Sequence, residues 1–353
     1  MKKILEKLNS TNNLTKDELI GLLDHFQSNS EGTEDRETLY NYATQARLQA
    51  YGKKVYLRAL LEFSSYCKNS CHYCGLRKAN RKAGRYRLSP MEIIECSEAS
   101  YNLGYRTIVL QSGEDLYFQD TILGSLIREI KRRCPGMAVT LSIGERSRHS
   151  YEYLYKSGAD RFLLRHETVN PHLYRRLHPG MDQGARLQCL QDLKDIGYQV
   201  GAGFIVGLPG QNNRTLADEL LYIKALEPDM VGIGPFIPHP ETPLGSMEPG
   251  SSQLTLAVLA LARLLLPETL LPITTALNTL DPLSWEKGLQ AGANVLMPNI
   301  TPPVMRDKYE LYEGKKNTDV SHLKDIKVRI EDAGFEVDMS CGDSLKWLRN
   351  KEV

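Results

Sequence analysis

The residues best suited to chemistry are three cysteines that lie within eight positions of one another, Cys67, Cys71 and Cys74. A disulfide framework is typical of small secreted chains with an even number of cysteines, so this tight group favours a metal centre. Three thiolates can bind a [4Fe–4S] cluster, which normally takes four, and one iron then stays open to a substrate or cofactor. The other four of the seven cysteines are far apart in the chain: Cys96, Cys134, Cys189 and Cys341.

Two other interpretations of the three cysteines stay open. Zinc could bind the three thiolates together with His72. However, His72 is adjacent to Cys71, whereas zinc ligands are usually separated by two or more residues, and no second ligand pair follows in the chain. The cysteines could also be structural and bind no metal.

The elements that must position the cysteines alternate between strands and helices from Lys54 onward. Continuous apolar strands separated by helices indicate a parallel sheet that is covered on both faces. Eight such units predict a (β/α)₈ TIM-type barrel, and an open doubly wound sheet is the alternative. The predicted strands are Val55–Phe63, Thr107–Gly113, Ala138–Gly144, Arg161–Glu167, Val200–Gly207, Met230–Ile237, Leu271–Leu277 and Ala293–Ile300.

Three regions make up this predicted α/β fold. Residues 1–50 are expected to form an N-terminal helical extension, and residues 51–305 the barrel. Residues 306–353 are expected to form a C-terminal helical extension that closes the barrel.

Polar residues gather where the predicted strands end. Barrel enzymes build their sites at the carboxyl ends of the strands, and the three cysteines directly follow the first strand. The sequence therefore predicts one site at that end. Its polar residues are Ser112, Gly113, Glu114, Arg165, His166, Glu167, Pro235, His239, Thr274, Thr275 and Asn299.

Composition excludes several classes of protein. The chain has 353 residues, 41% hydrophobic and 25% charged, with a net charge of +1 and a pI near 7.6. These values are typical of a soluble globular protein and offer no basic surface for nucleic acid or for a membrane. The most apolar stretch, Leu254–Pro267, contains Arg263 and is shorter than the ~20 residues of a membrane span, so it predicts a buried helix. No signal peptide is visible, and we expect a cytoplasmic protein.

The Cys-x₃-Cys-x₂-Cys spacing after the first strand of a barrel resembles the signature of the radical S-adenosylmethionine (SAM) enzymes. The resemblance implies that SAM chelates the open iron through its amino and carboxylate groups. It also implies that one electron from the cluster cleaves the S–C5′ bond of SAM and gives a 5′-deoxyadenosyl radical.

The same resemblance implies which residues hold the cofactor. Ser112-Gly113-Glu114 resembles the family's Gly-Gly-Glu motif for the methionine amino group, with Ser at the first position. Tyr73 is the aromatic residue expected at the adenine, and Gly203–Gly207 resembles the fifth-strand adenine motif. Glu167 and Arg186 could hold the ribose and the methionine carboxylate, which an arginine grips in a bidentate manner. The implied cofactor-binding residues are Tyr73, Gln111, Ser112, Gly113, Glu114, Glu167, Arg186, Ile205 and Leu208.

Longer runs, such as Met230–Leu244, resemble the HydE family of [FeFe]-hydrogenase maturases. The resemblance implies a small-molecule or organometallic substrate, namely a cysteine-bound iron carbonyl–cyanide precursor of the H-cluster. It also implies maturases of the HydG and HydF types as partners and a low-potential electron donor of the ferredoxin or flavodoxin type.

The barrel interior is expected to hold this substrate. Threonine, serine and arginine side chains would bind its carboxylate and cyanide groups, and methionines would form soft, polarizable walls. Tyr309 and Tyr312 could close the lower mouth of the barrel, and Arg58 could add a second positive group. The methionines could equally be ordinary core residues. The predicted substrate residues are Arg58, Thr140, Ser142, Arg165, Met230, Thr274, Thr275, Met297, Tyr309 and Tyr312.

Some members of the family that this sequence resembles have cysteines near the C-terminus that bind a second cluster. Residues Glu313–Asp325 contain no cysteine and Cys341 stands alone, so we predict a single cluster.

Two other functions stay open. One is a methylornithine-synthase-like radical mutase that acts on a free amino acid, and the other is a non-catalytic metal-binding scaffold protein.

Overall fold

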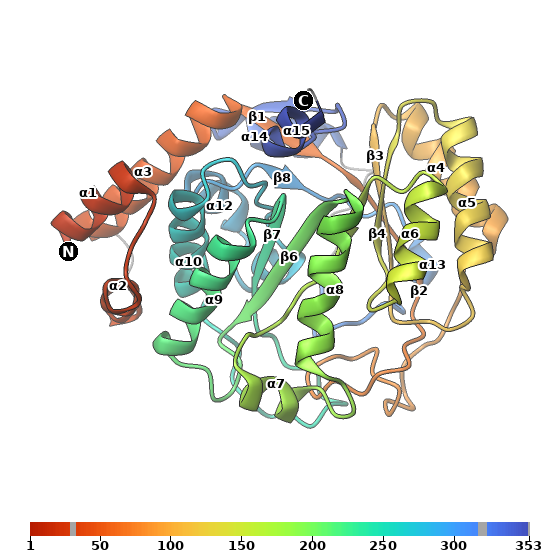
Figure 1. Cartoon of the computed structure of the whole chain (residues 1–353), viewed down its shortest axis with the longest axis horizontal. Helices are drawn as coiled ribbons and strands as arrows, with labels where there is room; N and C mark the ends of the chain where they lie inside the picture. The colour runs from red at the N-terminus through yellow and green to blue at the C-terminus, as the bar shows by residue number, and fades with distance from the viewer. Residues whose placement is uncertain (29–32, 317–322, 352–353) are drawn as a thin grey trace.

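Parallel strands surrounded by helices form the centre of the molecule in this computed structural model, which describes residues 1–28, 33–316 and 323–351 (Figure 1). The main sheet has six parallel strands that pair in the order of the chain. They are β2 (Ala59–Ser64), β3 (Thr107–Ser112), β4 (Ala138–Ser142), β5 (Arg161–Leu163), β6 (Gln199–Val206) and β7 (Met230–Pro235).

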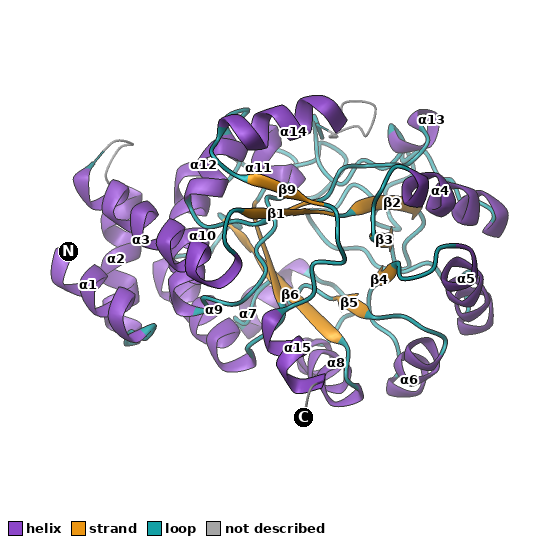
Figure 2. Cartoon of the chain, turned by 90° about the horizontal axis from the view of Figure 1, so that it is seen from above, coloured by secondary structure: helices purple, strands orange, loops and turns teal. Residues whose placement is uncertain are grey.

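Further pairings close this sheet into a ring. β1 (Lys54–Leu57) precedes β2 with Arg58 between them, and β1 pairs in parallel with β8 (Val295–Leu296). Single parallel bridges at Leu270 and Pro272 connect β7 to β8. Figure 2 shows the strands in the middle with helices around them. The predicted TIM-type barrel is confirmed, and isolated bridges take the place of its seventh strand.

The predicted strand Leu271–Leu277 is wrong in its second half. Helix α11 begins at Thr275 and runs to Leu280. The Thr274 hydroxyl accepts a hydrogen bond of 3.3 Å from the amide of Leu277, so this threonine caps the helix. A cap of this kind turns the chain out of the strand direction.

Helices cover the outside of the ring, and α10 is the most apolar of them. Every side chain of α10 from Leu254 to Leu265 is buried, because the helix lies between β7 and the N-terminal helices α2 and α3. A helix that is apolar on all sides is stable only when it is buried, and the prediction for this segment is confirmed. The outer helices are α4 (Pro90–Asn102), α5 (Asp120–Arg133), α6 (Arg148–Lys156), α7 (Pro171–Leu177), α8 (Gln183–Ile196), α9 (Asn213–Leu226), α10 (Ser252–Leu265), α12 (Ser284–Gln290) and α13 (Pro303–Arg306).

Helices at the two ends of the chain lie outside this covering layer. Those of the N-terminal side are α1 (Lys2–Thr11), α2 (Lys16–Ser28) and α3 (Glu34–Tyr51). The C-terminal part consists of α14 (Leu323–Asp332), β9 (Glu336–Asp338) and α15 (Leu345–Lys351). Among the described helices, none combines the length and the apolar character that a membrane crossing requires.

β9 was not predicted, and it pairs in parallel with β1 outside the ring. Figure 1 shows α14 and α15 at the top of the molecule, opposite α7, which follows a strand at the carboxyl end of the barrel. The C-terminal part therefore covers the amino ends of the strands. The predicted boundaries at residues 50/51 and 305/306 stay predictions. Residues 29–32, 317–322 and 352–353 of the predicted extensions lie outside the described residues.

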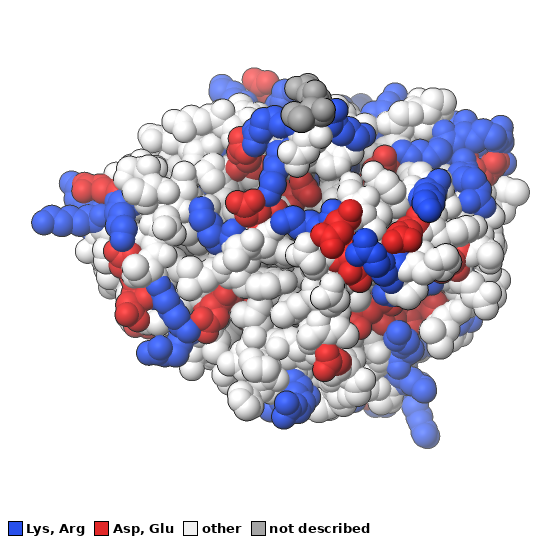
Figure 3. Space-filling view, viewed as in Figure 1, with Lys and Arg blue, Asp and Glu red and all other residues white. Residues whose placement is uncertain are grey.

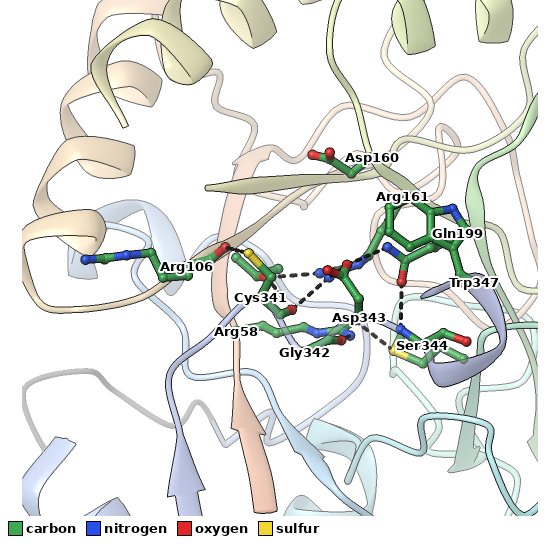
Figure 4. Close-up of polar contacts among 12 residues, drawn as sticks. Arg58, Arg106, Asp160, Arg161, Gln199, Cys341, Gly342, Asp343, Ser344 and Trp347 are labelled. Carbon is green, nitrogen blue, oxygen red and sulfur yellow. Dashed lines mark hydrogen bonds and ion pairs between the residues drawn. The ribbon is translucent and has the colours of Figure 1, made fainter. Parts of the chain in front are cut away.

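A network of polar contacts fastens residues 341–344 to the amino ends of the strands (Figure 4). The guanidinium of Arg161, which is 2% exposed, lies 2.5 Å from Asp343 and donates to the carbonyl of Cys341 at 2.8 Å. Gln199 donates to the same Asp343 oxygen at 2.6 Å, and buried Arg58 donates to the carbonyl of Gly342 at 3.0 Å. Two buried arginines thus donate part of their hydrogen bonds to this short segment.

Lysine and arginine side chains are intermixed with aspartate and glutamate on the face drawn in Figure 3. This distribution agrees with the net charge of +1.

Asp343→Ala should lower the free energy of unfolding by about 3 kcal/mol, because buried Arg161 would lose its carboxylate partner. Denaturant titration followed by circular dichroism measures this change. Lys346→Ala is the matched control, since it breaks an exposed ion pair to Glu227 in the same segment. The control should cost less than about 1 kcal/mol. Equal losses in the two variants would contradict the role of Asp343.

Candidate functional site

Two adjoining cavities open at the carboxyl end of the barrel. The larger, about 290 Å³, is lined by all three clustered cysteines, and we call it the cysteine cavity. The second, about 190 Å³, is lined by strand residues such as Leu60, Met230 and Met297, and we call it the inner cavity. The residues that line both are Gln111, Ser142, Leu163, Arg165, Ala276, Leu311 and Tyr312. The shared walls place the two spaces directly beside each other.

The cysteines lie on a loop that follows β2 and is held from inside by Arg85. The guanidinium of Arg85 donates to four backbone carbonyls, at 2.5 to 3.2 Å. The loop is also tied to the barrel, because the Lys68 amide donates to the carbonyl of Glu114 at 2.9 Å. The sequence analysis did not identify Arg85, because no sequence pattern distinguishes an arginine that binds the carbonyls of its own loop from any other arginine.

Burial and the neighbouring charged groups raise the pKa of all three cysteine thiols. Burial is the main cause in each case, and it raises the pKa of Cys74 to about 12. Metal binding must therefore displace a proton from each thiol. In the described part of the chain no three His, Cys, Asp or Glu side chains are placed to hold a metal ion. A four-iron cluster binds each thiolate at a different iron, so it suits thiols that line one cavity without meeting at one point.

Gly113 allows the cysteine loop to approach the end of β3. A Cβ atom at Gly113 would lie 2.3 Å from the carbonyl oxygen of Tyr66 and 2.7 Å from Cβ of Cys67. Gly144 has φ +76°, and a Cβ there would lie 2.0 Å from Cγ of Glu114. These distances leave no room for a side chain, so both positions require glycine. Both glycines line the cysteine cavity.

Tyr73 is oriented by a histidine that the sequence analysis did not select. Nδ1 of His178 lies 3.0 Å from the carbonyl of Tyr174, which can only accept, so this nitrogen donates. Nε2 then accepts from the Tyr73 hydroxyl at 2.8 Å. Burial lowers the pKa of His178 to about 4, in agreement with a neutral ring. His178 and Tyr73 both line the cysteine cavity.

The residues after β5 alternate between the cavities and the outer layer. Arg165 and Glu167 line the cysteine cavity, with a guanidinium–carboxylate distance of 3.4 Å. His166 is fully buried, and its Nε2 lies 3.1 Å from Glu219 on α9. Glu219 also accepts from the Thr168 hydroxyl at 2.6 Å, which fixes the turn where Glu167 adopts φ +65°. The histidine of this triplet is therefore a supporting residue.

Arg186 reaches the cysteine cavity from the first turn of α8. The helix start is set by Asp182, which accepts from the amide of Ala185 at 2.7 Å. Nε of Arg186 donates to the carbonyl of Arg165 at 2.9 Å, and Nη1 lies 2.9 Å from Glu145 and 3.4 Å from Glu114. These contacts use Nε and Nη1, and Nη2 has no partner among the described residues. A further anionic group in the cavity could bind there.

The inner cavity contains a buried ion pair that the sequence analysis did not find. Glu62 on β2 is 1% exposed, and its carboxylate lies 2.5 Å from the ammonium of Lys315. Asn299 donates to the other carboxylate oxygen at 2.9 Å. Lys315 follows the barrel in the chain, and no local pattern in the sequence indicates that its side chain enters the barrel.

The structure brings most of the predicted site residues to the two cavities. Three of the predicted cofactor- and substrate-binding residues line neither, and the same is true of the strand-end residues His166, His239 and Asn299. Leu208 packs with Ile205 and Phe236 in a small apolar cluster, and Thr140 is fully buried within β4. Arg58 lies at the amino end of the barrel because Gly342 holds it there, although its Nη1 also lies 3.3 Å from the sulfur of Met230.

The predicted residues that line at least one cavity are Cys67, Cys71, Tyr73, Cys74, Gln111, Ser112, Gly113, Glu114, Ser142, Arg165, Glu167, Arg186, Ile205, Met230, Thr274, Thr275, Met297, Tyr309 and Tyr312.

Tyr309 and Tyr312 were expected at the lower mouth, and the structure corrects this. Both line the cysteine cavity, and the carbonyl of Leu311 between them accepts from the amide of Gly75 in the cysteine loop at 2.8 Å. The segment that contains them therefore lies at the carboxyl end of the barrel.

Comparisons with known proteins identify the family of this chain. Residues 61–223 match the model of the radical SAM superfamily. The [FeFe] hydrogenase maturase subunit HydE of Thermotoga maritima is 49% identical over 279 residues, which is 79% of this chain and 80% of that protein. The 3-methylornithine synthase of Methanosarcina acetivorans is 29% identical over 333 residues, 94% of this chain and 92% of that protein.

Two solved structures share the fold. Methylornithine synthase (PylB) has a TM-score of 0.82 at 27% identity, covering 95% of this chain and 97% of that one. The maturase HydG has a TM-score of 0.81 at 20% identity, covering 96% of this chain and 75% of that one. Enzymes of the superfamily use a [4Fe–4S] cluster on three cysteines together with SAM, and the three cysteines are present here. The chain thus belongs to the radical SAM superfamily and, within it, to the HydE family of hydrogenase maturases.

Proposed function

We propose that the cysteine cavity holds the [4Fe–4S] cluster and SAM and that the inner cavity holds the substrate, a cysteine-bound iron carbonyl–cyanide precursor of the hydrogenase H-cluster. The observation that carries this proposal is the shared wall between the two cavities. A reactive species formed in one cavity then meets a substrate in the other without crossing solvent.

Cys67, Cys71 and Cys74 would bind the cluster, which on reduction supplies the electron that cleaves SAM to a 5′-deoxyadenosyl radical. The protein's own groups would orient the cofactor. Tyr73, held by His178, would present its ring to the adenine, and Nη2 of Arg186 would bind the methionine carboxylate.

The walls of the inner cavity suit an anionic organometallic substrate. Arg165 lines it, and its Nε is buried without a hydrogen-bond partner. An unpartnered buried donor gains a charge-assisted hydrogen bond when an anion enters. Met230 and Met297 contribute polarizable sulfur near the metal carbonyl groups. Thr274 and Thr275 line the same wall and would bind polar groups of the substrate.

Membership of the maturase family supports three partners, which we propose for this chain. A HydG-type maturase would supply the iron complex, and a HydF-type scaffold would accept the product. A ferredoxin or flavodoxin would deliver the electron to the cluster.

Cys→Ser at position 67, 71 or 74 should abolish both iron binding and 5′-deoxyadenosine formation, because the cluster would lose one of its three ligands. Iron analysis after anaerobic reconstitution, with about four irons expected in the unsubstituted protein, measures the first effect. Serine in place of Cys96, Cys134, Cys189 or Cys341 should retain the iron. Loss of iron from the Cys341 variant would refute the prediction of a single cluster.

Arg186→Ala should weaken SAM binding more than tenfold, because removal of one partner from a charged contact costs ~2–5 kcal/mol. Equilibrium binding of SAM to the reconstituted protein measures this, and the iron content should stay unchanged. Arg148→Ala, which removes an arginine from the exposed surface of α6, is the control. Unchanged SAM affinity in Arg186→Ala would assign the carboxylate to another residue.

Arg165→Ala should retain both the cluster and the slow, uncoupled formation of 5′-deoxyadenosine. It should lose hydrogenase maturation, since the anionic substrate would lose its charge-assisted hydrogen bonds. Thr275→Val should give a smaller loss, on the order of 1 kcal/mol for a neutral hydrogen bond. Hydrogenase activity matured by each variant is the measurement. Full maturation by Arg165→Ala would remove Arg165 from the substrate site.

The same preparation tests the proposed function against the mutase alternative. Incubation of the reduced protein with lysine and SAM, followed by mass spectrometry, should give no methylornithine. Formation of methylornithine without any support of hydrogenase maturation would replace the proposed function.

A further inference from the structure

Three large apolar side chains are exposed beside the cysteine loop: Tyr66, Leu116 and Tyr117. Their exposed fractions are 36%, 73% and 51%, and none of the three lines either of the two cavities. The guanidinium of Arg87 lies 3.7 Å from the ring centroid of Tyr66 and 5.0 Å from that of Tyr117. We call these four side chains the aromatic patch. Exposed apolar side chains that lie together, unlike scattered ones, mark interaction sites.

A single carboxylate orders the aromatic patch. Buried Asp115 accepts from Nε and Nη2 of Arg87 at 2.7 and 2.9 Å and from the amide of Tyr117 at 3.0 Å. It also accepts from the Ser64 hydroxyl at 2.6 Å, and the oxygen of that hydroxyl accepts from the amide of Tyr66 at 3.2 Å. A surface that is ordered before binding loses little conformational entropy in a complex. Tyrosine and arginine are also frequent at the centres of protein interfaces, so the patch has the properties of a binding surface.

The cysteine loop next to the aromatic patch has an excess of positive charge. Three of its cations pair with carboxylates, which belong to Glu114, Asp115 and Glu241. The exposed Glu310 lies close by, because its backbone carbonyl contacts Gly75. Even with all four carboxylates counted, positive charges outnumber negative ones. Residues 64–89 contain no aspartate or glutamate and seven cations: Lys68, Arg77, Lys78, Arg81, Lys82, Arg85 and Arg87. Figure 1 shows this loop in orange at the lower end of the molecule.

The aromatic patch lies beside a cluster ligand and outside the inner cavity. Tyr66 directly precedes Cys67, and Gly113 packs against both the carbonyl of Tyr66 and the side chain of Cys67. No residue of the patch lines the inner cavity, in which we place the substrate. A partner on the patch would therefore approach the cluster and not the substrate. Since we predict a single cluster, with no second one to relay electrons, the electron for SAM cleavage must come directly from such a partner.

We propose that the aromatic patch and the cysteine loop together dock a small acidic flavoprotein that reduces the cluster. The anionic hydroquinone of its flavin gives one electron to the oxidised [4Fe–4S] cluster and becomes the neutral semiquinone. The apolar edge of an exposed flavin matches the tyrosine and leucine side chains, and acidic residues around the flavin match the positive loop, which steers the encounter. This inference rests on the proposed function for the cluster and its need of an electron, and it adds the docking surface and the chemistry of the donor.

Calorimetric titration of the reconstituted holoenzyme, with SAM bound, against an oxidised acidic flavodoxin measures the affinity. Leu116→Glu and Lys78→Glu should each weaken binding about tenfold, because one places a negative charge in the patch and the other reverses a charge of the loop. Binding to the unsubstituted protein should also weaken as salt is added, since salt screens exposed charges. Unchanged affinity in both variants would overturn the inference.

Leu103→Glu and Lys156→Glu are the matched controls and should bind flavodoxin as tightly as the unsubstituted protein. Leu103 follows α4 and is 52% exposed, and Lys156 is the exposed last residue of α6. Both helices lead into strands of the barrel, so both positions lie at its amino end, away from the cysteine loop. A loss of the same size in the controls would show that total charge decides the binding, and it would overturn the docking surface.

Dithionite as the reductant separates docking from catalysis, because a small ion needs no docking surface. Leu116→Glu should retain its iron, its SAM affinity and its dithionite-driven formation of 5′-deoxyadenosine. With reduced flavodoxin at limiting concentration, its rate should fall about tenfold, in line with the weaker binding. Tyr117→Ser is a second variant of the patch, and it should show the same difference between the two reductants. An equal loss with dithionite and with flavodoxin in both variants would make the patch structural.

Other partners are outcomes of the same titration. A ferredoxin, or a maturase of the HydG or HydF type, could depend on Leu116 and Lys78 while flavodoxin binding does not, and that result would overturn the inference. Failure of the unsubstituted protein to form 5′-deoxyadenosine with dithionite would instead refute the proposed function. Intact dithionite-driven cleavage with flavodoxin binding that ignores the patch would refute the docking surface alone.

Discussion

Two charged side chains inside the barrel, Glu62 and Arg161, take their ion-pair partners from the segments beyond the barrel. At the carboxyl end, Lys315 neutralises Glu62, and at the amino end Asp343 neutralises Arg161. A buried charge without a partner is strongly destabilising, so these two pairs bind the chain that follows the barrel to both of its openings. The closed interior on which the chemistry depends is therefore a product of electrostatics as much as of apolar packing.

The wall between the two cavities depends instead on contacts within the barrel itself. Arg165 lies in the wall between the two cavities. Its guanidinium pairs with Glu167 on the side of the cysteine cavity and also lines the inner cavity. Glu219 holds the turn behind this arginine through contacts with residues 166 and 168. The fully buried histidine between Arg165 and Glu167 anchors this stretch of the chain to α9 through Glu219.

The cysteine loop illustrates a second way in which distant segments complete the site. The loop is tied to β3 through Glu114, to α7 through an amide–carbonyl bond between His72 and Leu177, and to the segment after the barrel through Leu311. Gly113 is necessary because a side chain there would collide with Cys67. The positions of the three thiols thus depend on elements from most of the length of the chain.

The sequence by itself determined the barrel, the cysteine site and the end of the barrel where it lies. The alternation of apolar strands with helices repeats eight times, and the Cys67–Cys74 spacing is local, so both patterns are legible without a structure. The helix cap at Thr274 was missed because a threonine suits a strand and a helix start equally well. Only the tertiary structure decided that Lys315 enters the inner cavity, that Arg58 belongs to the amino end and that His178 orients Tyr73. Each of these depends on contacts between residues far apart in the chain, and burial and pairing at such distances leave no local pattern in the sequence.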